Sequence, residues 1–286
     1  MFRDISLERM NPLDYLRLTR PPNGLLMVTA VMVGHYVQST RLPGPLEALL
    51  ASATAYCLSS SSMVLNDIVD REIDSVSNPE RPIASGRVSV RSAWFFAVIL
   101  GALGLASAAA LGPPLLFVAV IFYTLATVYN TYLKRRGLAG NIAVSATIAA
   151  PYIFGAVLAD GRVGGLVSIF ALMSFLAGLG REVVKGIPDV EGDALKGVKT
   201  LAVTRGPRVA ARLGVFFVML AIVLSPIPFL LNQVGLPYLV LVAVADAGFV
   251  YSSAKLLRDL PSSRRVKREY LLWMGIALAA FMLGAV

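Results

Sequence analysis

The chain has 286 residues, of which 57% are hydrophobic and 15% charged, and its mean hydropathy is +0.72. Soluble domains are about half apolar and about a quarter charged, so this composition excludes an ordinary soluble protein and indicates an integral membrane protein. The net charge of +9 could suit a nucleic acid. However, Lys and Arg cluster in short loops between apolar runs, as the positive-inside rule expects, and we predict no nucleic-acid partner.

Long apolar runs predict an all-α fold, because a backbone in lipid must form its own hydrogen bonds. The N-terminal segment lacks the apolar core of a signal peptide, and the single Cys57 excludes an internal disulfide framework. Gly and Pro mark several helix boundaries, such as Pro21-Pro22, Pro43-Gly44-Pro45 and Gly112-Pro113-Pro114. We expect one transmembrane domain over residues 1–286, a bundle of nine helices around a central cavity. The predicted spans are 22–40, 46–65, 92–111, 113–132, 140–159, 164–181, 209–231, 236–257 and 270–286.

The positions of the basic residues predict the orientation of the bundle. Of the 26 Lys and Arg residues, only Arg41 and Arg162 fall in loops on the side opposite the N-terminus. Positively charged loops remain in the cytoplasm, so the N-terminus is expected inside the cell and the C-terminus outside. We predict a multi-pass protein of the cell membrane, with its cavity open to the cytoplasm and to lipid.

An acidic cluster follows the second predicted span, in the sequence NDIVDREID. Asn66, Asp70 and Asp74 are spaced by four residues, so on a continuing helix they share one face, with Asp67 beside them. Carboxylates near a bilayer are costly and usually mark a functional site. Stacked carboxylates with an amide oxygen suit Mg²⁺.

A second acidic cluster, DVEGD, follows the sixth predicted span and repeats the four-residue spacing at Asp189 and Asp193. Both clusters are expected at the cytoplasmic face. Two sparse clusters favour two Mg²⁺ ions that share a diphosphate, because Mg²⁺ completes its shell with water and substrate phosphate. The alternative is a pair of solvated acidic helix ends that pair with Arg71 and Lys185.

Both segments resemble signatures of the UbiA-type intramembrane prenyltransferase superfamily. NDIVDREID followed by NPERPIASGRVS is similar to the first signature, and REVVKGIPDVEGDALKGVKTLAV to the second. Together with YNTYLK, they are most similar to the archaeal digeranylgeranylglyceryl phosphate synthase branch. The resemblance implies nine helices, Mg²⁺ dependence and transfer of a polyprenyl group from its diphosphate.

The resemblance also implies roles for individual residues in two motif loops, 66–91 and 181–208. Asn66, Asp70 and Asp74 would bind one Mg²⁺, and Asp189 with Asp193 another. Asp67 matches the pattern as a substrate-binding residue. The second signature often has an acidic residue after its lysine, where this chain has Gly186. Glu182 or Glu191 could replace that missing ligand.

Basic and aromatic residues complete the expected site. Lys134 and Tyr129 belong to the YNTYLK segment and are expected to be catalytic. The expected substrate-binding residues are Arg81, Arg87, Lys185, Arg20 and Asn23. Each basic residue has an alternative role as a positive-inside anchor or lipid contact. Aromatic faces can stabilise a passing carbocation, although Tyr123, Tyr132 and Tyr152 are more typical of packing or of an interfacial belt, and Tyr129 has the better claim.

Three other polar residues occur within predicted spans. Asp246 could approach the cavity or form an interhelical hydrogen bond with a hydroxyl group. His35 lies near the outer end of its span, and we assign it no catalytic role. Asn141 matches a recurrent family asparagine, but capping or packing explains it as well.

The proposed partners are a polyprenyl diphosphate donor, a lipophilic acceptor and membrane lipids. Geranylgeranyl is the favoured donor chain, and geranylgeranylglyceryl phosphate the favoured acceptor. An aromatic acceptor from quinone, haem or chlorophyll synthesis uses the same scaffold. CDP-alcohol phosphotransferases are disfavoured because NDIVDREIDSV lacks their glycine and Ala-Arg pair. A cation-coupled polyprenyl-phosphate carrier would place carboxylates at mid-membrane, where only Asp246 lies.

Overall fold

The computed structural model describes residues 11–195 and 197–284, and this part of the chain is helical with short connections. The long helices are α2 (Pro21–Ser39), α3 (Pro45–Val69), α5 (Val90–Leu111), α6 (Pro113–Thr131), α7 (Leu138–Asp160), α8 (Gly165–Lys185), α11 (Pro207–Leu224), α13 (Leu236–Arg258) and α14 (Ser263–Gly284). The short ones are α1 (Pro12–Thr19), α4 (Arg71–Ser77), η1 (Leu133–Arg135), α9 (Val190–Leu195), α10 (Leu201–Arg205), α12 (Ile227–Leu230) and η2 (Leu260–Ser262).

Within this described part, seven helical segments are long and apolar enough to cross a membrane: α3, α5, α6, α7, α8, α11 with α12, and α13. They confirm seven of the nine predicted spans. The other two predicted spans correspond to α2 and α14, which are helices of 19 and 22 residues. Their membrane crossing stays a prediction, since α14 begins with the charged sequence SRRVKRE.

Proline and glycine set several of the helix ends, as the sequence predicted. Pro21, Pro45 and Pro113 occupy the first turns of α2, α3 and α6. Proline suits this position because its fixed φ is helical and its missing N–H has no partner there in any helix. Gly112 joins α5 to α6 with a φ of 123°, which other residues rarely adopt.

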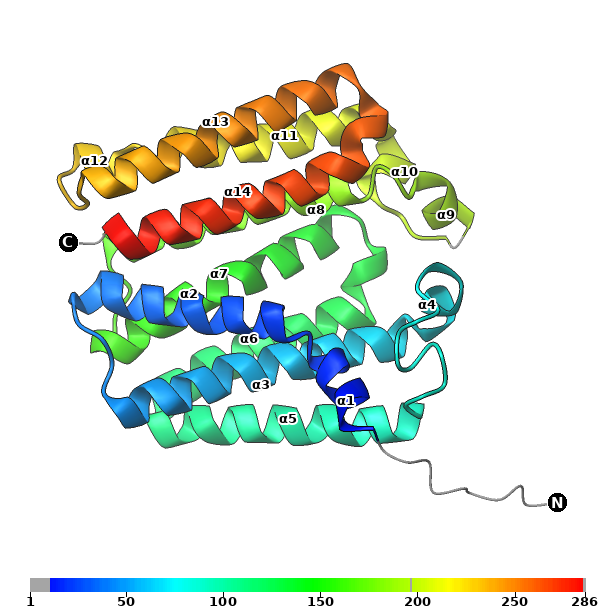
Figure 1. The fold of residues 1–286 in the computed structure, drawn as a ribbon, viewed down its shortest axis with the longest axis horizontal. Helices are drawn as coiled ribbons and strands as arrows, with labels where there is room; N and C mark the ends of the chain where they lie inside the picture. The colour runs from blue at the N-terminus through cyan, green and yellow to red at the C-terminus, as the bar shows by residue number, and fades with distance from the viewer. Residues whose placement is uncertain (1–10, 196, 285–286) are drawn as a thin grey trace.

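The long helices run roughly side by side (Figure 1). The principal packed pairs are α3 with α5, α2 with α7, α8 with α11, and α13 with α14. Glycine permits the closest approaches: a Cβ at Gly34 or Gly155 would collide with the backbone of the facing helix, and so would one at Gly180. Small residues of this kind let membrane helices pack backbone to backbone.

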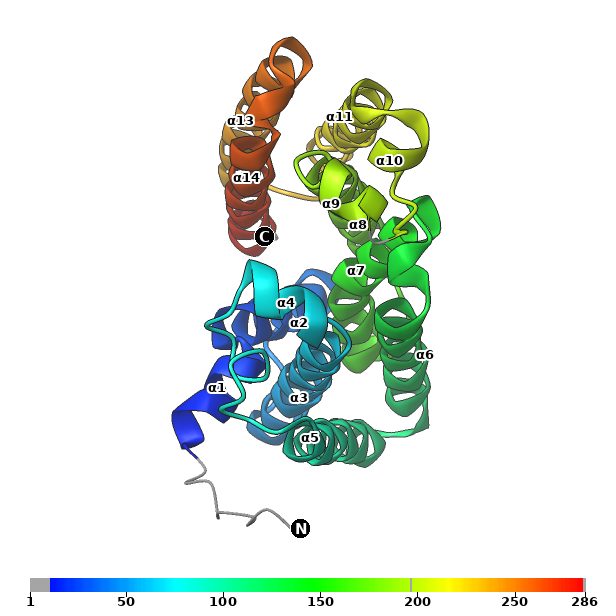
Figure 2. The same ribbon diagram turned by 90° about the vertical axis from the view of Figure 1, so that its right-hand side faces the viewer.

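Both acidic segments lie at one end of the bundle. α4 and α9 extend beyond the long helices at the right of Figure 1, whereas α12 and the end of α14 lie at the left. Figure 2 looks onto the right-hand end and shows α4 and α9 both on it. The chain order of the helices and their alternating direction therefore bring the two motifs to a common end, as the sequence predicted. We call this end the motif end.

Candidate active site

The first acidic cluster lies where α3 passes into α4. Asp70 has φ −87° and ψ 2°, which ends α3 and begins α4. The helical hydrogen bonds nevertheless continue, from Asp70 N to the Asn66 carbonyl (2.9 Å) and from Asp74 N to the Asp70 carbonyl (2.8 Å). The four-residue spacing therefore keeps its helical phase through a bend. Asp67 and Asp74 are each only 3% exposed.

Two arginines from other segments neutralise Asp67 and Asp74. Arg81 Nη1 lies 2.5 Å from Asp74 Oδ2 and 3.2 Å from Asp67 Oδ1. Arg20 also forms an ion pair with Asp67. Arg20 has φ 48°, a left-handed conformation between α1 and α2 that redirects the chain at this point. Asn78 donates a further hydrogen bond to Asp74 Oδ1 (3.0 Å).

The loop that carries Arg81 is held by its own apolar residues. Ile83 and Val88 are 2% and 3% exposed and pack in one core cluster with Leu18, Val64 and Ala93. This cluster joins the loop to α1, α3 and α5. Burial of these side chains positions Arg81 over the carboxylates, because each apolar anchor stabilises the loop by about 1.5–3 kcal/mol.

The third carboxylate, Asp70, is paired with Lys134 of η1. Asn66 links the two: with its N–H toward Asp70 Oδ2 and its oxygen toward Lys134 Nζ, both distances are 3.0 Å. The Asn66 amide also lies 3.0 Å from Asn130 Oδ1. Asn130 is buried and donates to the Ser62 carbonyl (2.9 Å) and hydroxyl (3.0 Å). Asp67, Asp70 and Asp74 are thus each paired with a basic side chain.

A second network on α8 borders this cluster. The Glu182 carboxylate is 9% exposed and accepts from Arg181 Nη1 (2.8 Å) and Lys185 Nζ (3.0 Å). Glu182 also interacts electrostatically with Lys134 and Tyr129, and Tyr129 with Asp70. Lys134 and Tyr129 therefore lie between the acidic cluster of α3–α4 and the end of α8.

The second acidic cluster is more open than the first. Asp189 is exposed just after α8, and Asp193 is partly exposed in the six-residue α9. Asp193 N donates to the Asp189 carbonyl (2.8 Å), as the four-residue spacing requires. Across residues 11–195 and 197–284, no three His, Cys, Asp or Glu side chains form a ready-made metal site. The structure thus places both clusters at the motif end without joining them in one cage.

Gly186, the departure from the family pattern, has no conformational reason to be glycine. Its φ is −77°, and a Cβ there would lie 3.6 Å from Thr200 Cβ, an ordinary contact. An acidic side chain would fit on this backbone.

The structure does not bring every expected substrate-binding residue to the acidic cluster. Arg87 binds Asp14 Oδ1 (3.1 Å) and the Glu80 carbonyl (2.6 Å), which ties the motif loop to α1. Lys185 is exposed and contacts Glu182. Asn23 is partly buried in the first turn of α2.

The other polar residues in spans have structural partners. Asp246 accepts a hydrogen bond from the Ser225 hydroxyl (2.6 Å) at the end of α11, which is the interhelical bond that the sequence left open as one of two alternatives. His35 Nδ1 lies 3.0 Å from the Arg41 carbonyl, at the end opposite the motifs. Asn141 lies in the first turn of α7, where its N–H donates to the Gly137 carbonyl (3.2 Å). The Tyr123 hydroxyl pairs with Ser61 Oγ (2.7 Å).

Sequence reasoning did not single out Asn130 or Arg181, although both occur inside quoted motifs. A sequence signal existed for Asn130: it directly follows Tyr129 on a helix that is otherwise apolar. For Arg181 the signal was its adjacency to Glu182. The Asn130 side chain contacts Asn66, and the Arg181 side chain binds Glu182, so each positions a polar group beside the first acidic cluster.

The donor set of the first cluster is suited to a hard divalent cation. Its carboxylate and amide oxygens are Mg²⁺ ligands, and the surrounding Arg20, Arg81 and Lys134 match phosphate oxygens. A site with both kinds of group can hold a metal-bound phosphate ester without burying a large net charge.

Comparison with known proteins agrees with this chemistry. Residues 26–276 match the model of the UbiA prenyltransferase family. A digeranylgeranylglyceryl phosphate synthase of Methanopyrus kandleri is 37% identical over 268 residues, 94% of this chain and 97% of the relative. The synthase of Archaeoglobus fulgidus is also 37% identical, over 278 residues, 95% of this chain and 94% of the relative.

Solved structures share the same arrangement of helices. A structure from work on digeranylgeranylglyceryl phosphate synthase in membranes has a TM-score of 0.80 at 32% identity, covering 96% of this chain and 98% of the other. A UbiA homologue from Archaeoglobus fulgidus, bound to GPP and Mg²⁺, has a TM-score of 0.70 at 19% identity, covering 94% and 99%. The second likeness concerns the fold alone.

Proposed function

We propose, because this chain belongs to the UbiA prenyltransferase family, that it transfers a geranylgeranyl group from its diphosphate to geranylgeranylglyceryl phosphate. The chain is a membrane prenyltransferase, and the choice of acceptor rests on its relatives. Two digeranylgeranylglyceryl phosphate synthases are 37% identical over nearly the whole chain. The product would be an ether lipid with two isoprenoid chains.

One observation carries the proposal: three acidic residues at the α3–α4 bend, each paired with a basic residue. This cluster of six charges is balanced before substrate binds. A diphosphate with its Mg²⁺ is also nearly neutral as a unit. The diphosphate with its Mg²⁺ would replace the ion pairs inside the cluster: the carboxylates would face the metal, and the basic groups would face the phosphate oxygens. No uncompensated charge would then be buried.

The residues divide into a metal-binding set and a phosphate-binding set. Asn66, Asp70 and Asp74 would hold one Mg²⁺, and Asp189 with Asp193 a second. When bound, Mg²⁺ neutralises the charge that develops on the departing diphosphate.

Lys134, Arg81 and Arg20 would then hold the diphosphate oxygens. As the allylic C–O bond breaks, the electron pair leaves with the diphosphate, and these cations stabilise it in place. The acceptor hydroxyl oxygen forms the new C–O bond and releases its proton. The Tyr129 ring, beside Asp70 and Glu182, would face the positive allylic fragment.

The membrane arrangement follows from the same motifs. We place nine helices across the bilayer as one domain, with the N-terminus and the motif end in the cytoplasm. The charged headgroups would meet the site there, while the prenyl chains extend between the helices into the apolar part of the bundle.

The decisive experiment offers the purified protein geranylgeranyl diphosphate with a panel of acceptors and identifies products by mass. We expect a product with geranylgeranylglyceryl phosphate, together with Mg²⁺-dependent release of diphosphate. A product formed only with an aromatic acceptor would overturn the acceptor assignment. If labelled diphosphate were carried across a vesicle membrane without cleavage, the protein would be a carrier and the whole proposal would fail.

A further inference from the structure

A second basic site lies on the motif end, apart from the acidic cluster. A cavity of about 430 Å³ opens between the first turns of α11 and the end of α13 with η2. Three arginines border it: Arg208, Arg212 and Arg258. Arg208 is the last residue of the second motif loop, and neither acidic cluster contributes a residue to the lining.

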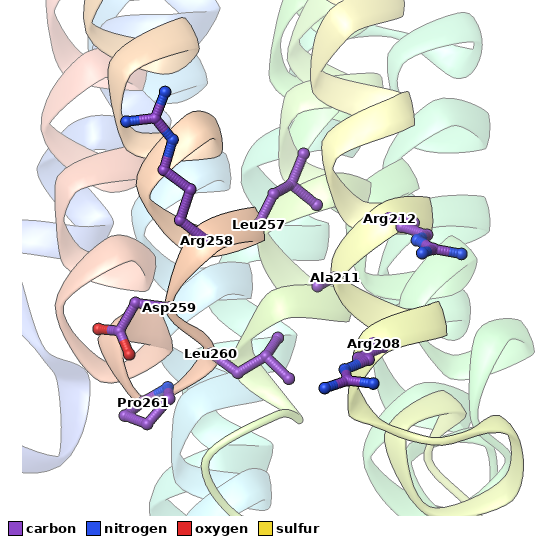
Figure 3. Close-up of a pocket in the computed structure, with 8 residues that line it drawn as sticks. All are labelled: Arg208, Ala211, Arg212, Leu257, Arg258, Asp259, Leu260 and Pro261. Carbon is purple, nitrogen blue, oxygen red and sulfur yellow. The ribbon is translucent and has the colours of Figure 1, made fainter.

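The three arginines that border this cavity have no acidic partner within the described part of the chain. All three side chains are exposed. By contrast, Arg20, Arg81 and Arg181 are all paired. Figure 3 shows Arg208 beside the gap between the two helices, with Arg212 and Arg258 extending outward on opposite sides. Like charges with no counterion separate in this way.

The floor of the cavity is apolar. Leu257 and Leu260 come from α13 and η2, and Ala211 from α11 (Figure 3). Asp259 is the single acidic residue in the lining, which leaves a formal charge of +2. A cationic rim above an apolar floor matches a molecule with an anionic head and a greasy body.

The position of the cavity points to the membrane surface as the source of that molecule. α11 and α13 are two of the segments long and apolar enough to cross a membrane. Their ends at the cavity are at the motif end (Figure 1), which the charge distribution assigns to the cytoplasmic side. Arginines at this depth meet the phosphate layer of the cytoplasmic leaflet.

We propose that this cavity binds the phosphate headgroup of an anionic membrane phospholipid. Rotation of the long, exposed Arg208 and Arg212 side chains would bring both guanidinium groups onto the phosphate, which suits the bidentate geometry of Arg with phosphate oxygens. The acyl or isoprenoid chains lie over Leu257 and Leu260. A free phosphate ion would use the arginines but gain nothing from the apolar floor, so we commit to the lipid.

Lipid binding can be measured on the intact protein without any substrate, so the result is independent of the transfer reaction. The purified protein is transferred to a zwitterionic detergent and titrated with phosphatidylglycerol, with phosphatidylcholine or with inorganic phosphate. Bound lipid is counted by native mass spectrometry, and the midpoint of thermal unfolding is followed in parallel. We expect phosphatidylglycerol alone to bind and to raise the unfolding midpoint.

The variants test whether the cavity is responsible. R208Q/R212Q should weaken phosphatidylglycerol binding about 30-fold, because each surface Arg contributes on the order of 1 kcal/mol. The matched control is R264Q/R268Q, which removes the same charge from exposed positions on α14 that do not line the cavity. The control should bind lipid like the unmodified protein. A single R258Q variant serves as a second probe if the double variant unfolds early without lipid.

Two results would overturn the inference. Equal weakening in R208Q/R212Q and R264Q/R268Q would mean that net charge, and not the cavity, attracts the lipid. A stabilisation by inorganic phosphate equal to that by phosphatidylglycerol would mean that the site holds a free anion.

Discussion

The two acidic motifs share a residue spacing but differ in how the protein holds them. The motif at the α3–α4 bend is buried, and three basic residues from distant segments pair with its carboxylates. The motif around α9 is open, with Asp189 exposed. Apolar anchors hold both loops, Ile83 and Val88 in the first and Ile187 and Ala202 in the second, so the difference lies in the exposure of the carboxylates and in the basic partners of the first set. Spacing therefore determines which groups share a face, and the basic side chains that other segments supply determine which carboxylates are already held in place.

This contrast suggests a division of labour. Under the proposed function, the first motif would receive the diphosphate with its metal. The second would close onto the substrate afterwards, because an exposed short helix breaks few buried contacts when it shifts. The predictions below test that division, beginning with the largest expected effect.

Replacement of Asp70 by Asn should affect both activity and stability. Turnover is expected to fall about 100-fold or more, the scale seen when one transition-state charge contact is removed. Lys134 loses its partner, so the thermal midpoint should fall as well. Product formation at saturating Mg²⁺ and thermal unfolding measure the two effects.

Glu72→Gln is the matched control for Asp70→Asn, since Glu72 is an exposed acid of α4 with no ion pair in the described structure. It should leave both quantities unchanged. Near-normal turnover of Asp70→Asn would show that the first motif does not bind the metal.

Replacement of Asp189 by Asn should separate activity from stability. We expect a loss of turnover by about 100-fold, as for Asp70. The thermal midpoint should not move, because the Asp189 carboxylate is exposed and has no ion pair in the described structure. A clear fall in the midpoint of Asp189→Asn would contradict the contrast between the two motifs.

Replacement of Glu182 by Gln should mainly affect stability. The change removes the negative partner of Arg181 and Lys185. Breaking a buried ion pair lowers the free energy of unfolding by about 3 kcal/mol. Thermal unfolding of the substrate-free protein would show the loss. Glu191 is exposed, so Glu191→Gln is the control and should leave the thermal midpoint unchanged.

Replacement of Gly186 by Asp should have the smallest effect and a favourable sign. The backbone accepts a side chain there, so the fold should not change. An added carboxylate beside the second motif should lower the Mg²⁺ concentration for half-maximal rate several-fold, since charge count tunes the affinity of such sites. Gly192→Asp, in open space on α9, adds the same charge as a control. An equal shift in both variants would indicate a general charge effect.

Much of the fold was accessible from the sequence because lipid imposes simple rules. Apolar runs of sufficient length had to be helices, and Pro21, Pro45 and Pro113 marked their first turns. The basic loops indicated which ends belong together. The bend at Asp70 was not predictable, since a regular continuation of α3 would satisfy the same four-residue pattern.

The pairing of charges was harder to predict than the charges themselves. Arg20 and Asp67 are 47 positions apart, and they meet because a left-handed residue turns the chain between α1 and α2. Arg81 was expected at the site, and Arg87 was expected beside it. Only the burial of Ile83 and Val88 decides that Arg81 faces the carboxylates while Arg87 faces Asp14.

One backbone contact connects the second motif loop to η1, the segment that carries Lys134. Lys199 N donates to the Arg135 carbonyl (3.1 Å), and Gly137 passes so close to the Lys199 carbonyl that no side chain would fit between them. Arg135 directly follows Lys134, the partner of Asp70. The backbone of residues 197–200 therefore helps to fix the loop from which Lys134 reaches Asp70, so that the second acidic segment and the first share a mechanical support.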